Sequence, residues 1–177
     1  MASDFMIGFH PVQTDKDIAM VAKLAREIWR KHYNSIIGDK QVEYMLEKFQ
    51  SEAAISDQIA NGYQYYLIRN GDSSIGYLAV ILQMQESPQR MMVSKIYVVQ
   101  NYRGIGCGKA AIRFAEKLCV QSGAKMLWLT VNKYNSNTIN WYEHMGFVNA
   151  RSVVQNIGAG FIMDDYVMEK VIVADKE

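Results

Sequence analysis

Apolar residues in the first third of the chain recur every three or four positions, which is the spacing of an amphipathic helix. The first such stripe begins at Ile18 and runs to about Tyr33. Thr14 or Asp15 can cap it, because a short polar side chain satisfies the free N–H groups of a first turn. The pattern predicts a short strand followed by three helices: residues 5–12, a helix to about residue 33, and helices over residues 39–49 and 51–61.

Strand-like segments rich in aliphatic and aromatic residues follow Gly62, which ends the third helix. Asn70-Gly71-Asp72 is a tight-turn signal, because Asn-Gly tolerates the positive φ of hairpin turns. The strand–helix–strand unit from Met91 to Thr130 predicts a parallel pair, whereas the shorter connections predict antiparallel pairs. The remaining elements are expected as strands over residues 63–69, 75–84, 91–98, 125–130, 147–155 and 161–173, and as helices over residues 106–122 and 136–145.

No Pro- or Ser-rich linker and no repeat interrupts this order of elements. The length of 177 residues lies close to the ~150 residues of a typical domain. We therefore expect residues 1–177 to form one α/β domain. Its sheet should be mixed, mostly antiparallel and about seven-stranded, with helices flanking it.

Composition restricts the class of partner and the compartment. The chain carries 19 basic and 18 acidic residues, a net charge of +1, so its overall charge favours neither nucleic acid nor an anionic membrane as partner. No basic n-region with an apolar h-region opens the chain, and no apolar run approaches the ~18 residues of a membrane span. Two cysteines, Cys107 and Cys119, make neither a disulfide framework nor a metal-ligand spacing. We expect a cytoplasmic protein without a metal.

Chemistry is concentrated in the glycine-rich segment Gln100–Lys109, between a predicted strand and a predicted helix. Alternating glycines allow backbone N–H groups to approach a ligand closely, and a helix N-terminus favours phosphate. Arg103 and Lys109 add positive charge suited to a diphosphate. Cys107 at this helix start is expected to have a lowered pKa, although a covalent role is not expected, because the residue should point away from the loop. The segment therefore predicts an anion-binding loop.

Two common phosphate-binding motifs describe this loop poorly. A Walker A loop needs glycine where Arg103 stands and Ser or Thr where Ala110 stands. The spacing Gly106-x-Gly108-x-x-Ala111 fits a dinucleotide-binding turn. About seven residues nevertheless separate it from the strand end at Val98, and no acidic residue ends the next strand. A dinucleotide-binding oxidoreductase remains an alternative.

Two blocks of residues together resemble the GNAT superfamily of acyl-CoA-dependent N-acyltransferases. Arg103–Gly108, after Ile96-Tyr97-Val98, resembles the acetyl-CoA signature of that family. Asn135–Phe147 resembles its Asn-x-x-Ala-x-x-x-Tyr-Glu-x-x-Gly-Phe segment, with Thr138 in place of the common Ala and His144 in place of the common Lys. Neither departure removes a reacting group. The resemblance covers nearly the whole chain and implies the GNAT fold.

The resemblance implies acetyl-CoA as co-substrate and an amine as acceptor. Backbone groups of the strand Ile96, Tyr97 and Val98 would pair with the pantetheine arm. Asn135 and Tyr142, two helical turns apart, would lie about 10 Å apart on one helix face along that arm. The CoA diphosphate would bind the loop residues Arg103, Gly104, Ile105, Gly106, Cys107, Gly108 and Lys109.

Direct attack by a neutral amine on the thioester expels a thiolate with a pKa near ~8.5, which a phenol of pKa ~10 can protonate. Tyr142 is therefore the expected general acid, and a backbone N–H near Val98 would polarise the thioester carbonyl. The general base stays open among Glu27, His32, Glu43, Glu86, Asp164 and Asp165. The expected acceptor-site residues are Trp29, His32, Tyr33 and Asp165.

The acceptor is expected to be a small primary amine such as a polyamine, or a protein amine. Homodimers are common in the family that the chain resembles, so a homodimer is one expected assembly. A CoA-binding sensor or regulatory module without turnover is the alternative from a different class of protein, because an intact loop predicts binding in both cases.

Overall fold

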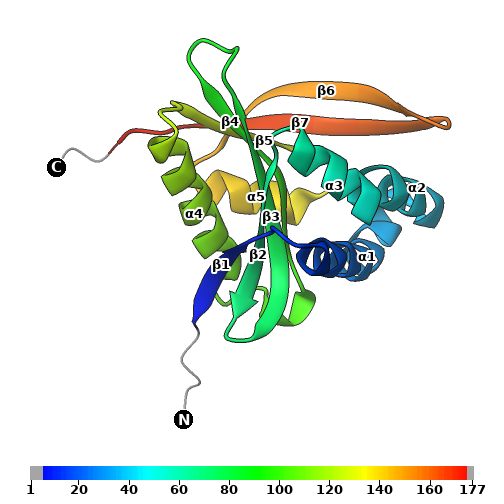
Figure 1. Cartoon of the computed structure of the whole chain (residues 1–177). Helices are drawn as coiled ribbons and strands as arrows, with labels where there is room; N and C mark the ends of the chain where they lie inside the picture. The colour runs from blue at the N-terminus through cyan, green and yellow to red at the C-terminus, as the bar shows by residue number, and fades with distance from the viewer. Residues whose placement is uncertain (1–5, 175–177) are drawn as a thin grey trace. The chain divides into compact units, whose positions relative to one another are not determined.

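The computed structural model of the chain describes residues 6–174 (Figure 1). Its elements follow the predicted order throughout. The strands are β1 Ile7–Pro11, β2 Gln64–Asn70, β3 Ser73–Gln83, β4 Arg90–Val98, β5 Met126–Asn132, β6 Val148–Gly158 and β7 Phe161–Val171. The helices are α1 Asp15–Ile37, α2 Asp39–Gln50, α3 Glu52–Ala60, α4 Cys107–Gln121 and α5 Ser136–His144, with a 3₁₀ turn at Gln100–Tyr102.

The strands form a seven-stranded sheet in the order β1-β2-β3-β4-β5-β7-β6. β4 and β5 pair in parallel, starting with Arg90 opposite Met126. The pairs β1–β2, β2–β3, β5–β7 and β6–β7 are antiparallel. The prediction of an α/β fold with a mostly antiparallel sheet of seven strands is confirmed, including the parallel strand–helix–strand unit.

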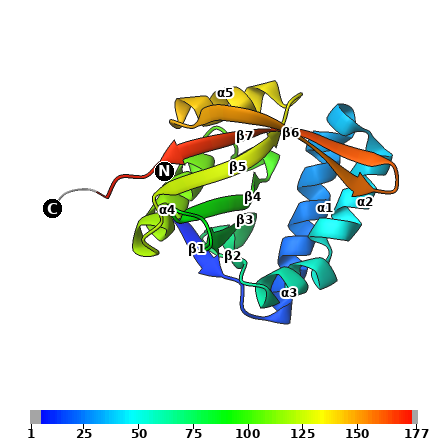
Figure 2. The same ribbon diagram turned by 90° about the horizontal axis from the view of Figure 1, so that it is seen from above.

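The chain divides into two compact units. The first contains the residues up to Ile81 together with Lys95–Arg113, and the second contains Leu82–Ser94 together with the residues from Phe114 onward. In the first unit α1 and α2 run side by side, with α3 against both (Figure 2). In the second unit β6 and β7 form a long hairpin, and α5 lies along β6 (Figure 2).

Helix α1 begins where the sequence predicts and ends later. Thr14 accepts a hydrogen bond from the N–H of Asp17, whose carboxylate accepts one from the N–H of Thr14, so both ends of a capping box are made. The helix continues to Ile37, one turn beyond the expected end near Tyr33. Gly38, with φ of 87°, ends it by donating its N–H to the carbonyl of Asn34.

The start of α4 packs onto the sheet of the first unit through small side chains. Cys107 and Ala111 join a buried cluster with Ile68, Ile75 and Val98. This packing fixes the beginning of α4, and with it the glycine-rich loop, against β2, β3 and the end of β4. The described residues contain no helix that is both long and apolar enough to cross a membrane.

In the second unit a lysine holds the end of α5. Lys170, on β7, donates a hydrogen bond of 2.8 Å to the carbonyl of Met145, the C-cap of α5, and forms an ion pair with Glu116 of α4. A cation is favoured at this position because the last carbonyls of a helix carry partial negative charge. The helix that carries Tyr142 is therefore attached at its C-terminal end to the sheet.

Candidate functional site

The glycine-rich loop has an open, ordered backbone. After β4 the chain makes a 3₁₀ turn, in which the N–H of Arg103 donates to the carbonyl of Gln100. Gly104 and Gly106 then take φ values of 77° and 95°, which side-chain-bearing residues rarely adopt. A Cβ at either glycine would meet no atom within 4 Å. The two glycines are thus required by backbone conformation, and the space beside them is free for a ligand.

This loop leads directly into the N-terminus of α4. The first helical hydrogen bond joins the N–H of Ala110 to the carbonyl of Gly106, so the N–H groups of residues 107–109 precede the helical ladder. No acidic residue lies in this first turn, and the side chain of Lys109 there is exposed. Free N–H groups, a positive helix end and a lysine together fit an anionic group such as a diphosphate.

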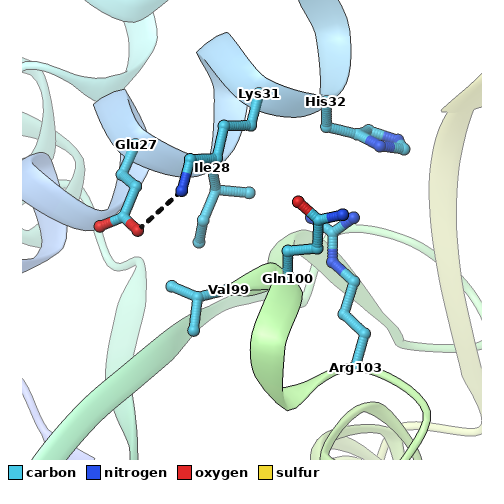
Figure 3. A pocket seen from close by; sticks show the side chains of 7 residues that line it. All are labelled: Glu27, Ile28, Lys31, His32, Val99, Gln100 and Arg103. Carbon is cyan, nitrogen blue, oxygen red and sulfur yellow. Dashed lines mark hydrogen bonds and ion pairs between the residues drawn. The ribbon is translucent and has the colours of Figure 1, made fainter.

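Arg103 uses one nitrogen of its guanidinium group to bind the backbone, and its side chain also lines a cavity. Its Nε donates a hydrogen bond of 2.9 Å to the carbonyl of Val98, at the end of β4. Figure 3 shows that its side chain and that of Gln100 rise from the loop toward α1. Arg103 thus fixes the loop to the strand whose residues Ile96–Val98 were predicted to bind pantetheine.

A cavity of about 100 Å³ lies between this loop and α1 (Figure 3). His32 reaches it from α1, and Arg103 and Gln100 reach it from the loop. Lys31, also on its wall, pairs with Glu27 one turn earlier, at 3.5 Å. The sequence predicted His32 at an acceptor site and placed Gln100 at the start of the glycine-rich segment. It did not identify Lys31 or the proximity of α1 to the loop, because no local pattern relates the two. The lining residues are Glu27, Ile28, Lys31, His32, Val99, Gln100 and Arg103.

Cys107 does not have the lowered pKa expected from its place at a helix start. Its side chain is only 1% exposed and packs in the core cluster, and burial raises the pKa of its thiol. The expectation of a lowered pKa is therefore wrong. Desolvation of the thiolate outweighs the helix N-terminus here.

The predicted acceptor residues of α1 form one aromatic cluster with β3 and β4. Trp29 lies 4.5 Å from Tyr33 and 5.5 Å from Tyr97, measured between ring centroids. Tyr77 lies 5.4 Å from Tyr97, and His32 meets the edge of Tyr33 at 4.7 Å. The structure thus brings Trp29, His32 and Tyr33 together with Tyr97 of the predicted pantetheine strand.

A buried lysine on the same strand as Tyr97 was not identified from the sequence. Lys95 lies on β4 with 6% of its surface exposed. The signal is its position: Met91, Val93 and Lys95 alternate along the buried face of the strand, where a charged residue needs partners.

In the second unit, Asn135 and Tyr142 lie on α5 as expected. Asn135 is the N-cap residue, 4% exposed, and its side chain makes no capping hydrogen bond. Tyr142 is 6% exposed, and its ring contacts Trp141 at 5.1 Å and Phe147 at 5.6 Å. The α5 helix therefore presents a buried polar residue at its start and a packed tyrosine two turns later.

Asp165 has the most distinctive environment among the general-base candidates. The residue pairs with Asn132 in the β5–β7 register, three residues before the N-cap of α5. Burial, and secondarily the neighbouring Asp164 charge, raise the pKa of Asp165 to about 6. A carboxylate of this kind can take a proton near neutral pH.

Three other base candidates are held in ion pairs. Glu27 pairs with Lys31, Asp164 pairs with Lys133 at 2.7 Å, and Glu43 pairs with Arg30 at 2.7 Å. The hydrogen bond from Arg30 lowers the pKa of Glu43, which makes that carboxylate a weaker base. Glu86 lies in the connection between β3 and β4. No cluster of three or more His, Cys, Asp or Glu side chains suited to a metal ion occurs among residues 6–174.

Comparison with known proteins gives a family match over most of the chain. Residues 22–147 match the model of the Acetyltransferase (GNAT) family. This range contains both blocks of the sequence signature, Arg103–Gly108 and Asn135–Phe147.

Similar proteins have acetyltransferase names. An uncharacterized N-acetyltransferase in the pepI 3′ region of Lactobacillus delbrueckii subsp. lactis is 24% identical over 174 residues, covering 95% of this chain and 100% of that one. A spermidine N(1)-acetyltransferase of Thermoplasma acidophilum is 22% identical and covers 84% of this chain and 91% of its own. The crystal structure of PaiA N-acetyltransferase from Thermoplasma acidophilum in complex with coenzyme A superposes with a TM-score of 0.75 at 20% identity, covering 94% and 99% of the two chains.

Proposed function

The chain belongs to the acetyltransferase (GNAT) family, and from this we propose that it transfers the acetyl group of acetyl-CoA directly to a primary amine, with Tyr142 as general acid. Membership makes it an acetyl-CoA-dependent N-acetyltransferase that acts on amine acceptors. The observation that carries the proposal is the family match, which spans the anion-binding loop and the α5 segment together. We also propose that the two compact units act as one catalytic domain, because the match includes residues of both.

The loop residues Arg103–Lys109 would bind the diphosphate of acetyl-CoA. Support comes from the free first-turn N–H groups of α4, the positive φ of Gly104 and Gly106, and the exposed Lys109. Backbone groups of Ile96, Tyr97 and Val98 would align the pantetheine arm, with Asn135 as a further polar partner. Acetyl-CoA supplies the activated acetyl thioester.

Tyr142 would act at the moment when the carbon–sulfur bond breaks. The amine nitrogen forms a bond to the acetyl carbon, and the thiolate leaving group takes the phenolic proton of Tyr142. The proton that the amine nitrogen loses passes to a base, and the raised pKa of Asp165 makes that carboxylate our candidate. Release of this proton from Asp165 to solvent and uptake of one proton from solvent by the Tyr142 phenolate restore both groups for the next turnover. A thiolate with a pKa near ~8.5 is a poorer leaving group than a thiol, so protonation favours completion of the transfer.

The acceptor we propose is a polyamine or another small primary amine, with a protein amine as the second possibility. The Thermoplasma acidophilum relative acts on spermidine, which carries primary amines. In this chain Trp29 and Tyr33 belong to an aromatic cluster, and aromatic rings attract a cationic amine. Asp165 and His32 complete the proposed acceptor residues.

The experiment is an acceptor screen in which CoA release is followed with spermidine, shorter diamines and a peptide with a free N-terminus. Tyr142→Phe should lower kcat by roughly 10²–10⁴-fold, the usual contribution of a general acid, and leave the affinity for acetyl-CoA within about twofold. Tyr134→Phe is the matched control, because Tyr134 is an exposed tyrosine in the connection that precedes α5 and its replacement should leave kcat unchanged.

Each other outcome has a clear meaning. Wild-type activity in Tyr142→Phe would remove the general-acid role from the proposal. Tight acetyl-CoA binding by the wild-type protein without CoA release for any amine would favour a CoA-binding sensor instead of an enzyme.

A further inference from the structure

Lys95 ties three elements of the first unit together through its ammonium group. Its Nζ donates to the carbonyl of Phe49 at 2.5 Å, to Oε1 of Gln58 at 2.9 Å and to the hydroxyl of Tyr65. These acceptors belong to the end of α2, to α3 and to β2, respectively. The lysine makes no ion pair with any residue of the described chain, so these neutral oxygens are what stabilise its charge.

The hydrogen bonds around Lys95 form a closed network. Tyr65 uses its own proton to donate to Oε1 of Gln58 at 2.6 Å, and Nε2 of Gln58 donates to the carbonyl of Phe49 at 3.2 Å. An ammonium has three N–H groups and no acceptor, which matches three oxygens. Burial lowers the pKa of Lys95 to about 7, so the charged form of this lysine carries a substantial desolvation penalty, against which the three oxygens act.

The position of this network explains why a cation is useful there. The carbonyl of Phe49 lies at the C-terminus of α2, where unsatisfied carbonyls and the helix dipole favour positive charge. Beside it, Gln50 accepts a hydrogen bond of 3.0 Å from the hydroxyl of Tyr77, and both residues are buried. Lys95, on β4, and Tyr77, on β3, therefore attach the corner between α2 and α3 to the sheet.

The same attachment reaches the aromatic cluster. Lys95 and Tyr97 stand two residues apart on β4 and point to the same face. Tyr77 contacts Tyr97, and Tyr97 contacts Trp29 of α1, the helix that packs against α2 and α3. A shift of the α2–α3 corner would therefore change the spacing of the rings against which the acceptor is proposed to bind.

We propose that Lys95 is a positioning residue for acetyl transfer: it fixes the α2–α3 corner on β4 and thereby holds the aromatic wall of the acceptor site at its working spacing. This inference rests on the proposed function. It assigns Lys95 no contact with the reacting atoms. Its effect should therefore fall on the acceptor amine and spare the binding of acetyl-CoA by the glycine-rich loop.

The test compares the steady-state constants of Lys95→Met and wild type, with the best acceptor of the screen, and measures acetyl-CoA affinity by calorimetry. We expect the KM for the amine to rise about tenfold and the dissociation constant of acetyl-CoA to change less than twofold. Lys95→Arg keeps a cation with N–H donors and should restore the amine KM at least partly. Lys48→Met, an exposed lysine on α2, is the matched control and should leave both constants unchanged.

A gentler variant guards against loss of folding. Tyr65→Phe removes one of the three oxygens around Lys95 and should raise the amine KM two- to fivefold, so it decides the question if Lys95→Met does not fold. A merely stabilising lysine would reduce the active fraction, giving a lower apparent kcat with both constants unchanged, and that result would overturn the proposal. An inactive wild-type protein would instead refute the proposed function, and this inference with it.

Discussion

Two charged side chains lie almost wholly out of solvent, and burial moves their pKa values in opposite directions. The pKa of Lys95, in the first unit, is lowered to about 7, and the pKa of Asp165, in the second unit, is raised to about 6. In each case desolvation disfavours the charged form of the side chain. Lys95 has three oxygens around it, whereas the Asp165 carboxylate makes no hydrogen bond or ion pair within residues 6–174. A buried carboxylate left without donors is a feature to expect where a proton must be taken up.

Asp165→Asn should stabilise the protein near neutral pH. The folded pKa of about 6 exceeds the ordinary 3.8, so the folded state binds the proton more strongly, and wild-type stability should fall as pH rises from about 4 to 6. Above pH 6 the variant should be more stable by roughly 3 kcal/mol, and at pH 4 the difference should nearly vanish. Urea denaturation at both pH values measures this.

The control for that measurement is Asp72→Asn, at an exposed hairpin position, which should show little difference at either pH. Equal stability of Asp165→Asn and wild type at pH 7.5 would show that the Asp165 charge is not penalised by burial. Activity of the same variant then reports separately on the base role proposed for Asp165.

At the scale of elements, β3 and β4 approach closely at one glycine. A Cβ on Gly76 would lie 2.3 Å from the carbonyl oxygen of Tyr97 and 3.1 Å from the Cα of Val98. Because both contacts are with backbone, no side-chain rotation can relieve them. Strand β4, which carries Ile96–Val98, can therefore lie this close to β3 only because Gly76 has no side chain.

Gly76→Ala should therefore lower the free energy of unfolding by about 3 kcal/mol or more. Overpacking typically costs roughly 1–3 kcal/mol, and a clash with backbone lies at the upper end of that range or beyond it. Gly8→Ala is the matched control, because Gly8 also lies in a strand, its Cβ would meet nothing within 4 Å, and its change should be nearly neutral. Thermal unfolding of both variants provides the comparison. A similar melting temperature for the two would contradict the close approach of β3 and β4.

Elements were predictable where the signal is local, and the site was predictable only in part. Hydrophobic periodicity and turn residues located each strand and α-helix of residues 6–174, but not the 3₁₀ turn at Gln100–Tyr102. The glycine-rich loop was recognisable from its spacing. The end of α1 was placed one turn early because the apolar stripe stops before Gly38, which is the residue that ends the helix. Lys95 and Cys107 were missed or misjudged because their properties depend on partners far away in sequence, such as Phe49 and Ile75.

At the scale of the whole molecule, ligand binding should appear as stability. Acetyl-CoA at 100 times its dissociation constant adds about 2.7 kcal/mol, which for a protein of this size raises Tm by roughly 5–10 °C. Gly106→Ala should reduce this rise, because alanine strains a backbone held at φ of 95° and the loop must adopt another conformation. Differential scanning fluorimetry with and without acetyl-CoA measures both effects.

Two comparisons make that result specific. Gly71→Ala strains a hairpin at φ of 57° outside the loop, so it should lower Tm without reducing the rise caused by acetyl-CoA. NADPH should give no rise. Stabilisation by NADPH in place of acetyl-CoA would support the dinucleotide-binding alternative and contradict the assignment of the loop.

The burial of both cysteines has a practical consequence for kinetic work. Cys107 and Cys119 are 1% and 0% exposed, and burial raises the pKa of each thiol, that of Cys119 to about 11. A chromogenic thiol reagent should therefore not react with the folded protein but should react at once with free coenzyme A. Its absorbance then measures the amount of coenzyme A released, without subtraction of a signal from the enzyme. In denaturant the same reagent should titrate two thiols per chain, which makes it a direct measure of the unfolded fraction.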